Sequence, residues 1–337
     1  MKFFCYLLIF FVISGCQTGY YRGPISDHFD GEKFYYPGEK DKKHSIVFFT
    51  IWKAILQNPW PKQLPEIRYA TLPHYTQGIK VIFVNHSTVL MQSKQVNFLM
   101  DPIYSYRASP FAWFGPARFK KPGIEFIELP KIDVVLISHN HYDHLDLPTL
   151  KRLNKTFSPL FIVPLGNKIL LNQNGIDNVV ELDWWQQKKF KDATITFLPA
   201  HHSAQRWLTD RNRTLWGSFG IQVANKKIYF AGDTAYANHF KLIRQRWGKP
   251  DFSFIPIGAY EPREILKPYH LNPQEAVKSH LELGSHASMG IHWGTFQMSA
   301  EPIEKPVIDL EAARKEFHVA EKDFFVIREG EPFYVNQ

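Results

Sequence analysis

Cysteine is nearly absent from this chain, which has only Cys5 and Cys16 among its 337 residues. Cys5 lies within an apolar stretch, residues 3–13, that follows Met1 and Lys2. A charged start followed by a short apolar stretch predicts a signal peptide that is removed. The mature chain would then keep one cysteine, which excludes an internal disulfide and a thiolate metal site. Any metal ion must therefore be held by histidine and carboxylate side chains.

Long hydrophobic runs are also lacking. Residues 3–13 fall short of the ~20 apolar residues that a membrane-spanning helix needs, and no later stretch is apolar enough to span a bilayer. Ile13-Ser14-Gly15-Cys16 resembles a bacterial lipobox, which predicts cleavage before Cys16 and attachment of a diacylglyceryl group to its sulfur. We therefore expect a lipid-anchored protein of the bacterial cell envelope. Gln17, directly after the cysteine, favours an anchor in the outer membrane, with the protein facing the periplasm. The alternative is that Cys16 carries no lipid and is an ordinary small residue near a secretory cleavage site.

Neither sign of charge dominates the chain, since 40 lysines and arginines stand against 32 acidic residues, for a net charge of +8. The basic residues are spread thinly and no nucleic-acid-binding motif is present, so nucleic acid is not an expected partner. A moderately basic surface favours anionic lipid head groups or phosphate esters. The hydrophobic content of 45% predicts a sizeable packed core.

The chain divides into three parts on composition. Residues 1–15 are the predicted signal peptide, and residues 16–75 form an extension whose many aromatic residues suggest that it packs partly on the core. Residues 76–337 form the main domain, where predicted strands and helices interleave, as in α/β proteins. The predicted strands are 80–84, 96–101, 133–137, 160–163, 194–198, 219–223, 227–231, 252–257 and 288–292. The predicted helices are 147–154, 166–173, 239–247, 273–283 and 308–317, with Asn272-Pro273 as cap and first residue of the fourth.

The most informative motif is HxHxDH at residues 139–144, directly after the buried-strand pattern of residues 132–137. Loops at the carboxyl ends of strands are where α/β folds place their chemistry. Residues two apart in an extended segment project to one side, so His139 and His141 can bind one ion together. Asp143 and His144 can then face a second ion, roughly 3.5–4 Å away. The alternative is a polar loop that is rich in histidine by chance.

Three later strands end in further metal-binding side chains: the pair His201-His202, Asp233 after Gly232, and His292. Neighbouring residues of a strand face opposite ways, so only one of His201 and His202 should be a ligand. Taken singly, Asp233 or His292 would be an ordinary polar residue at a strand end. Together with the HxHxDH motif, they complete a set of ligands for two metal ions. We expect the first ion to be bound by His139, His141 and one of His201 or His202, the second by Asp143, His144 and His292, and Asp233 to bridge the two.

These motifs, in this order, resemble the metallo-β-lactamase superfamily, and the resemblance extends from about residue 81 to residue 326. It implies a four-layer αββα sandwich. Within the superfamily the chain is similar to the N-acylphosphatidylethanolamine-hydrolysing phospholipase D group and its bacterial lipoprotein relatives. The segments that carry this similarity are 101–104, 107–110, 115–119, 136–146, 215–218, 231–236, 255–263 and 291–296.

The resemblance also implies roles for individual residues. The family motif Pro-x-x-His aligns with residues 199–202 and selects His202 as the ligand. Asn85 stands where the family has glycine, and we expect it to keep the turn because asparagine tolerates positive φ. Ser203 replaces a family tryptophan, and residues 203–214 depart further from the pattern. The implied metal ligands are His139, His141, Asp143, His144, His202, Asp233 and His292; the implied catalytic residues are Asp143, Asp233 and His270; the implied substrate contacts are His86, Tyr236, Tyr260 and His270.

The activity that the resemblance implies is hydrolysis of N-acylphosphatidylethanolamine to an N-acylethanolamine and phosphatidic acid. A hydroxide bridging two Zn²⁺ ions, or two other divalent ions, would attack phosphorus. Since a fold does not fix its substrate, the same site could act on a lactone, another ester or a soluble phosphodiester. A non-enzymatic metal-binding envelope lipoprotein is the third interpretation. The sequence leaves open the acyl preference and whether the protein is a homodimer.

Overall fold

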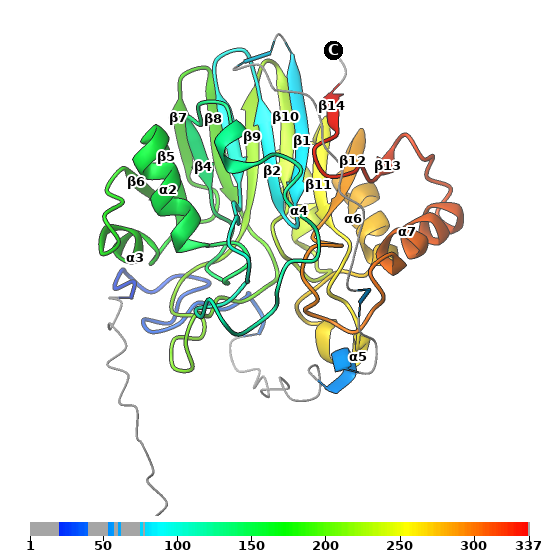
Figure 1. Cartoon of the computed structure of the whole chain (residues 1–337), viewed down its shortest axis with the longest axis horizontal. Helices are drawn as coiled ribbons and strands as arrows, with labels where there is room; N and C mark the ends of the chain where they lie inside the picture. Colours follow the sequence, from blue (N-terminus) through cyan, green and yellow to red (C-terminus); the bar gives the residue numbers. More distant parts are fainter. Residues whose placement is uncertain (1–19, 40–52, 57–59, 62–74, 77, 336–337) are drawn as a thin grey trace, which may run out of the picture.

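Two seven-stranded β-sheets face each other in the computed structural model, which describes residues 20–39, 53–56, 60–61, 75–76 and 78–335 (Figure 1). The first sheet contains, in spatial order, β14 (Pro332–Val335), β1 (Ile79–Asn85), β2 (Thr88–Gln92), β3 (Asn97–Met100), β4 (Val134–Leu136), β5 (Leu160–Pro164) and β6 (Val179–Leu182). The second contains β13 (Phe324–Phe325), β12 (Ala287–Ile291), β11 (Phe252–Pro256), β10 (Lys226–Phe230), β9 (Ser218–Val223), β8 (Ala193–Leu198) and β7 (Gln187–Phe190).

Helices cover the outer face of each sheet. The first sheet is covered by α2 (Leu147–Phe157) and α3 (Lys168–Asn172), and the second by α4 (His239–Arg246), α6 (Pro273–Leu283) and α7 (Lys305–Glu316). Two short helices, η1 (Phe126–Glu128) and α5 (Arg263–Leu266), lie in connections. The α/β class and the four-layer αββα sandwich expected from the sequence are therefore confirmed.

Strand β1 shows why the central strands are almost wholly apolar. Val81 and Phe83 belong to the core between the two sheets, whereas Ile82 and Val84 belong to the core beneath α2. Successive side chains of a strand point to opposite faces, and here both faces are covered. The buried helix residues Leu150 and Leu153 of α2 complete the outer core.

Most of the predicted elements are present, and the differences concern short or partly polar segments. The sequence reading missed β2, β6, β7, β13 and β14, and it began α7 three residues late. Strand β7 alternates between exposed and half-buried residues at the edge of its sheet, so it carries little hydrophobic signal. The cap of α6 is confirmed, because the Asn272 side chain accepts a hydrogen bond of 2.8 Å from the backbone N–H of Glu275.

The strand directions bring several strand ends together. In the first sheet β1 is antiparallel to β2, β2 is antiparallel to β3, and β3 is parallel to β4, so β1, β3 and β4 run the same way. By the same reasoning β8, β10 and β12 run the same way in the second sheet. The long connections gather at the lower end of the sandwich in Figure 1. All the sequence motifs with metal-binding side chains follow these six strands.

Part of the N-terminal extension lies against the main domain. Phe29 and Phe34 are buried in the core between the sheets. The ring of His28 stacks on Trp184 at 4.4 Å, and its Nε2 lies 2.8 Å from Asp183 Oδ1. The predicted signal peptide and Cys16 lie outside the described residues.

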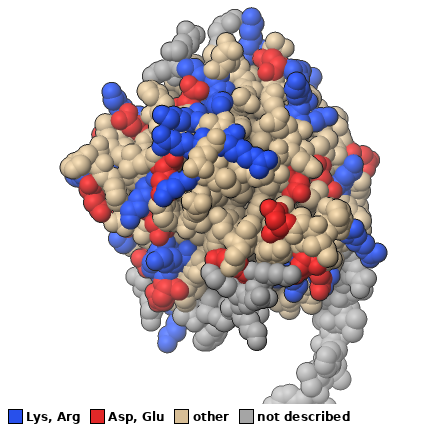
Figure 2. Space-filling view, turned by 180° about the vertical axis from the view of Figure 1, so that it is seen from behind, with Lys and Arg blue, Asp and Glu red and all other residues tan. Residues whose placement is uncertain are grey.

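Lysine and arginine side chains gather on one face of the molecule (Figure 2). Figure 2 shows lysine and arginine side chains gathered across the upper half of the face that Figure 1 hides, with single carboxylates between and around them. Among the residues that the structure describes, no helix has both the length and the apolar character needed to cross a membrane.

Candidate metal centre

Histidines and carboxylates converge at the strand ends of both sheets. His86 follows β1, Asp101 follows β3, and the loop from Ser138 to His144 follows β4. From the second sheet, His202 comes after β8, Asp233 after β10 and His292 after β12. Residues separated by more than 200 positions in the sequence thus meet at one place.

The first group of ligand atoms comes from three histidines. Nε2 of His139 lies 2.8 Å from Nδ1 of His141, and Nε2 of His202 lies 3.3 Å from the same Nδ1 atom. His139 and His202 are buried and His141 is partly exposed. Three imidazoles that point at a common position are the protein ligands of many catalytic zinc sites, which leave a further position for water.

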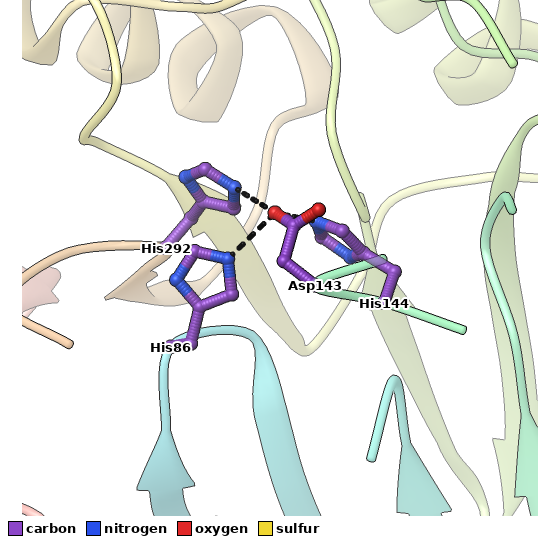
Figure 3. A group of neighbouring side chains, drawn as sticks. All are labelled: His86, Asp143, His144 and His292. Atoms are coloured by element: carbon purple, nitrogen blue, oxygen red, sulfur yellow. Dashed lines mark hydrogen bonds and ion pairs between the residues drawn. The ribbon is translucent and has the colours of Figure 1, made fainter. Parts of the chain in front are cut away.

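The second group surrounds the carboxylate of Asp143 (Figure 3). Its Oδ2 atom lies 2.9 Å from His86 Nε2, 3.1 Å from His144 Nε2 and 3.5 Å from His292 Nε2. All four side chains are buried. Asp143, His144 and His292 therefore meet as expected, and His86 joins them.

Asp233 lies between the two groups. Its Oδ2 atom is 3.1 Å from His292 Nε2 and 3.2 Å from His144 Nε2, on the side of the second group. The same oxygen is 3.8 Å from His202 Nε2 and 3.9 Å from His139 Nε2, on the side of the first. One carboxylate oxygen thus faces ligand atoms of both groups, as a bridging ligand must.

The buried polar atoms of this cluster fit divalent cations. Within the described part of the chain, Nε2 of His144, Nε2 of His292 and Oδ1 of Asp233 are buried and outside hydrogen-bonding geometry with any partner. Buried polar atoms normally have partners. A cation bound between the ring nitrogens and the carboxylates would satisfy these atoms, and imidazole with carboxylate is a donor set that suits Zn²⁺.

The two groups differ in charge. Burial, followed by the positive charge of neighbouring histidines, lowers the pKa of His141 to about 3. Burial likewise lowers the pKa of His202 to about 3, against the opposing effect of Asp233. Both rings are therefore neutral and can offer lone pairs to a metal ion.

In the second group the carboxylates reverse this effect. Burial on its own lowers the pKa of His292, but Asp233 and Asp143 raise it to about 9 overall. His144 is also shifted well above its ordinary pKa, because three carboxylates outweigh its burial. Without metal these rings hold protons, and a bound cation would take over that positive charge.

Further residues orient the ligands. Nδ1 of His144 lies 2.7 Å from Asp101 Oδ2, which fixes Nε2 toward the cluster. Asp101 also accepts hydrogen bonds from the backbone N–H and the hydroxyl of Ser138, at 2.7 and 2.6 Å. Nδ1 of His202 lies 2.9 Å from the carbonyl oxygen of Tyr269. Such partners fix which ring nitrogen faces the metal. The sequence reading missed this role of Asp101, although its position at the end of a predicted strand was a signal.

Sharp turns place several of these side chains. The φ angles of His86, Asp101 and His292 are +48°, +40° and +61°, a region that non-glycine residues seldom occupy and that is concentrated at functional sites. The turn expected at Asn85 is present between β1 and β2, with the positive φ at His86 rather than at Asn85. At Gly232 a β-carbon would lie 2.4 Å from Cβ of Ser138, which explains the Gly-Asp pair.

The adjacent histidines His201 and His202 face opposite ways. His202 joins the first group, whereas Nε2 of His201 lies 2.8 Å from Glu39 Oε2 of the N-terminal extension. His270, a predicted substrate contact, is half-buried beside the cluster, with Nδ1 3.8 Å from Asp233 Oδ2.

The other predicted substrate contacts lie differently. His86 is buried against Asp143 rather than exposed to a substrate. The Tyr260 hydroxyl donates to Asp309 of α7 at 2.6 Å, and the Tyr236 hydroxyl donates to Glu282 of α6 at 2.5 Å. Both hydroxyls therefore point to helices on the outer face of the second sheet.

Comparison with known proteins agrees with the geometry. The family model described as "Beta-lactamase superfamily domain" matches residues 96–293. An N-acyl-phosphatidylethanolamine-hydrolyzing phospholipase D of Caenorhabditis elegans is 37% identical over 272 residues, which are 74% of this chain and 76% of that protein. The mitochondrial protein of the same description from Saccharomyces cerevisiae is 37% identical over 74% of this chain and 56% of its own length.

More distant similarities concern the fold and one envelope protein. An isothiocyanate hydrolase from gut bacteria of Delia radicum has a similar structure, with a TM-score of 0.60, 19% identity, and coverage of 75% of this chain and 98% of that one. The outer membrane protein RomA of Klebsiella pneumoniae is 36% identical over 101 residues, 30% of this chain and 74% of that protein. The chain belongs to the metallo-β-lactamase superfamily as a metal-dependent hydrolase, with N-acylphosphatidylethanolamine-hydrolysing phospholipases D among its relatives.

Proposed function

We propose that this protein hydrolyses the phosphodiester bond of membrane phospholipids, with N-acylphosphatidylethanolamine as substrate and phosphatidic acid and an N-acylethanolamine as products. The observation that carries the proposal is the position of Asp233, whose carboxylate lies between two groups of metal-binding side chains. The 37% identity to two proteins named for this reaction supports the choice of substrate.

The proposed metal ions are two Zn²⁺. When bound, such ions lower the pKa of water toward neutrality and neutralise charge that develops on phosphoryl oxygens. His139, His141 and His202 would hold one ion, and Asp143, His144 and His292 the other, with Asp233 shared. His86 is placed to donate a hydrogen bond from Nε2 to Asp143 and so to orient that carboxylate.

The chemistry is a displacement at phosphorus. The oxygen of water forms a bond to phosphorus, the bond from phosphorus to the ethanolamine oxygen breaks, and this oxygen takes up a proton as the N-acylethanolamine leaves. His270 lies 5.2 Å from the His202 ring and 5.4 Å from the His292 ring, between centroids, and is only partly covered. This position supports a role for His270 in contacting the phosphate or the leaving oxygen.

A membrane substrate is supported by exposed aromatic residues near the metal-binding loop. Trp113 is 77% exposed and Phe114 is 57% exposed. The connection that carries them continues to Phe119, whose N–H donates a 2.8 Å hydrogen bond to the carbonyl oxygen of Thr295, three residues after His292. Tryptophan and phenylalanine on an otherwise polar surface favour the interface of a bilayer. Ser109 and Pro110 of this connection line a cavity of about 520 Å³ together with Asn140 and Tyr142 of the metal-binding loop.

We also propose that the mature protein is held at the cell envelope by a lipid on Cys16. The support is the lipobox-like sequence before this cysteine, and an anchor would keep the site near a bilayer substrate. Replacing Cys16 with Ser should move the protein from the membrane fraction to the soluble fraction and abolish incorporation of labelled palmitate. Retention of the label by the Cys16→Ser variant would contradict the anchor.

The function is tested by incubating the purified, zinc-loaded protein with single lipid classes in mixed micelles and identifying the products by mass spectrometry. N-acylphosphatidylethanolamine should yield phosphatidic acid and N-acylethanolamine, and the Asp233→Asn variant should yield neither. Turnover of only lactones, other esters or a soluble phosphodiester would replace the proposed substrate. Two bound metal ions without hydrolysis of any ester would contradict an enzymatic role.

A further inference from the structure

The loop 203–214, which departs from the pattern of the related family, reaches back to the metal-binding loop through one side chain. Nη1 of Arg206 donates hydrogen bonds to the carbonyl oxygens of Asn140, at 2.8 Å, and Leu145, at 2.7 Å. These two residues bracket His141, Asp143 and His144. One guanidinium nitrogen therefore ties together both ends of the segment that carries three of the candidate ligands.

The contact is reciprocal. The Tyr142 hydroxyl donates to the carbonyl oxygen of Arg206 at 2.9 Å, and the guanidinium carbon lies 4.0 Å from the centre of the Tyr142 ring. Behind Arg206, the buried Asp210 accepts hydrogen bonds from the backbone N–H groups of Arg206, at 3.0 Å, and Trp207, at 2.7 Å. The arginine is thus fixed at its backbone by its own loop and at its side chain by the metal-binding loop.

Arg206 contacts the metal-binding loop through hydrogen bonds to carbonyl oxygens. Burial lowers the pKa of its guanidinium, against the opposing effect of Asp146, Asp210 and Asp143, and its charge would repel bound divalent cations. What the planar guanidinium offers is a fixed pair of N–H groups aimed at two carbonyl oxygens. Its geometry, rather than its charge, matches the observed contacts.

We propose that Arg206 is a positioning residue that holds the loop of residues 139–145 in the shape needed to bind both metal ions. The inference rests on the proposed metal centre. Through Asn140 it fixes the backbone next to His139 and His141, and through Leu145 it fixes the backbone next to His144. Loss of Arg206 then weakens the binding of both ions, although Arg206 contacts backbone carbonyl oxygens of the loop and not the side chains that bind the ions.

The test compares Arg206→Ala, Arg206→Lys and, as control, Arg213→Ala. Arg213 lies on the same loop and donates to the exposed Glu32 at 2.6 Å, so its removal changes the charge equally without touching the metal-binding loop. Metal affinity is measured by competition with a chromophoric chelator, and ligand geometry by the absorption spectrum of the Co²⁺-loaded protein. Circular dichroism and thermal unfolding of the metal-free variants show whether each one folds.

We expect Arg206→Ala to bind both ions about 10- to 100-fold more weakly, as for other residues that orient metal ligands, and to alter the Co²⁺ spectrum. Arg206→Lys should recover part of the affinity, and Arg213→Ala should match the wild type. On a soluble phosphodiester, kcat should fall in Arg206→Ala while KM changes little. If Arg206→Ala does not fold, the inference is tested by comparing the metal affinity of Arg206→Lys with that of Arg213→Ala, and Arg206→Lys should bind the ions more weakly.

Two results would overturn the inference. Unchanged or tighter metal binding by folded Arg206→Ala, or by Arg206→Lys where it decides, would show that repulsion by the charge outweighs any positioning. A wild-type protein that binds no metal would overturn the metal centre itself. The wild-type titration therefore tests the metal centre separately from the role of Arg206, and the lipid hydrolysis assay tests the proposed substrate.

Discussion

The carboxylate of Asp101 lies 2.7 Å from Nδ1 of His144, so the other ring nitrogen of His144 faces Asp143 and Asp233. Asp101 is itself held by two hydrogen bonds from Ser138. Asp101→Asn keeps the size of the side chain but removes the charge that orients the ring. We expect about 10- to 100-fold weaker binding of the second ion, measured by metal titration with Asp192→Asn, at an exposed aspartate, as the control. Equal affinity in Asp101→Asn and the wild type would contradict this role.

The adjacent histidines His201 and His202 provide a matched pair of variants. His202→Gln should lose the ion bound by the first group and nearly all hydrolysis, because it removes one of three imidazoles at that position. His201→Gln should keep both ions, since His201 contacts Glu39 instead. Metal content measured by mass spectrometry, together with turnover, distinguishes the two. Similar metal content in both variants would show that the first ion is bound elsewhere.

The exposed aromatic residues Trp113 and Phe114 predict a difference between membrane and soluble substrates. The double substitution to serine should reduce binding to anionic phospholipid vesicles and hydrolysis of vesicle substrate, and leave hydrolysis of a soluble phosphodiester unchanged. Ile308→Ser is a suitable control, because Ile308 is 64% exposed on α7, a helix on the outer face of the second sheet. Loss of both activities would instead indicate damage to the metal centre.

The contact between the extension and the main domain should depend on pH. Burial lowers the pKa of His28, but the hydrogen bonds and charges of Asp183 and Asp27 raise it above its ordinary value overall. A raised pKa in the folded protein means that the contribution to stability is complete below about pH 6.5 and is lost as the pH rises through the folded pKa.

The stability of the metal-free protein to urea should therefore differ between wild type and His28→Gln more at pH 6 than at pH 9. A hydrogen bond to a charged group is worth about 1.5–3 kcal/mol, which sets the scale of the difference at pH 6. Asp183→Asn should reduce the stability in the same pH range but by less than His28→Gln, because Asp27 stays beside the His28 ring. A difference that grows with pH would show that His28 is neutral when it contacts Asp183.

The interleaved strands and helices and the motifs with candidate metal-binding side chains could be predicted from local signals, whereas the four-layer sandwich followed from the family resemblance. Buried strands such as β4 and β11 are continuous apolar runs, and the HxHxDH motif follows β4 directly. The orientation of His201 and His202 also follows from the alternation of an extended chain, although which of them binds metal needed the family resemblance. Edge strands such as β7 and β14 gave no comparable pattern, because β7 has no fully buried residue and β14 has only Val335.

Other features depend on contacts between distant segments and could not be derived in this way. The direction of the Tyr260 hydroxyl is set by Asp309 on α7, and the position of His86 by Asp143 across the cluster. The hydrogen bonds from Arg206 to the metal-binding loop join residues more than 60 positions apart. Each requires the register of both sheets, which strand patterns alone do not provide.

The central claim is that water attacks phosphorus at a two-metal centre organised by Asp233. Its most direct test is hydrolysis of N-acylphosphatidylethanolamine by the zinc-loaded protein in ¹⁸O-labelled water, with mass analysis of both products. We predict one ¹⁸O atom in phosphatidic acid, none in the N-acylethanolamine, and no products from Asp233→Asn. Label in the N-acylethanolamine, or undiminished hydrolysis by Asp233→Asn, would contradict the claim.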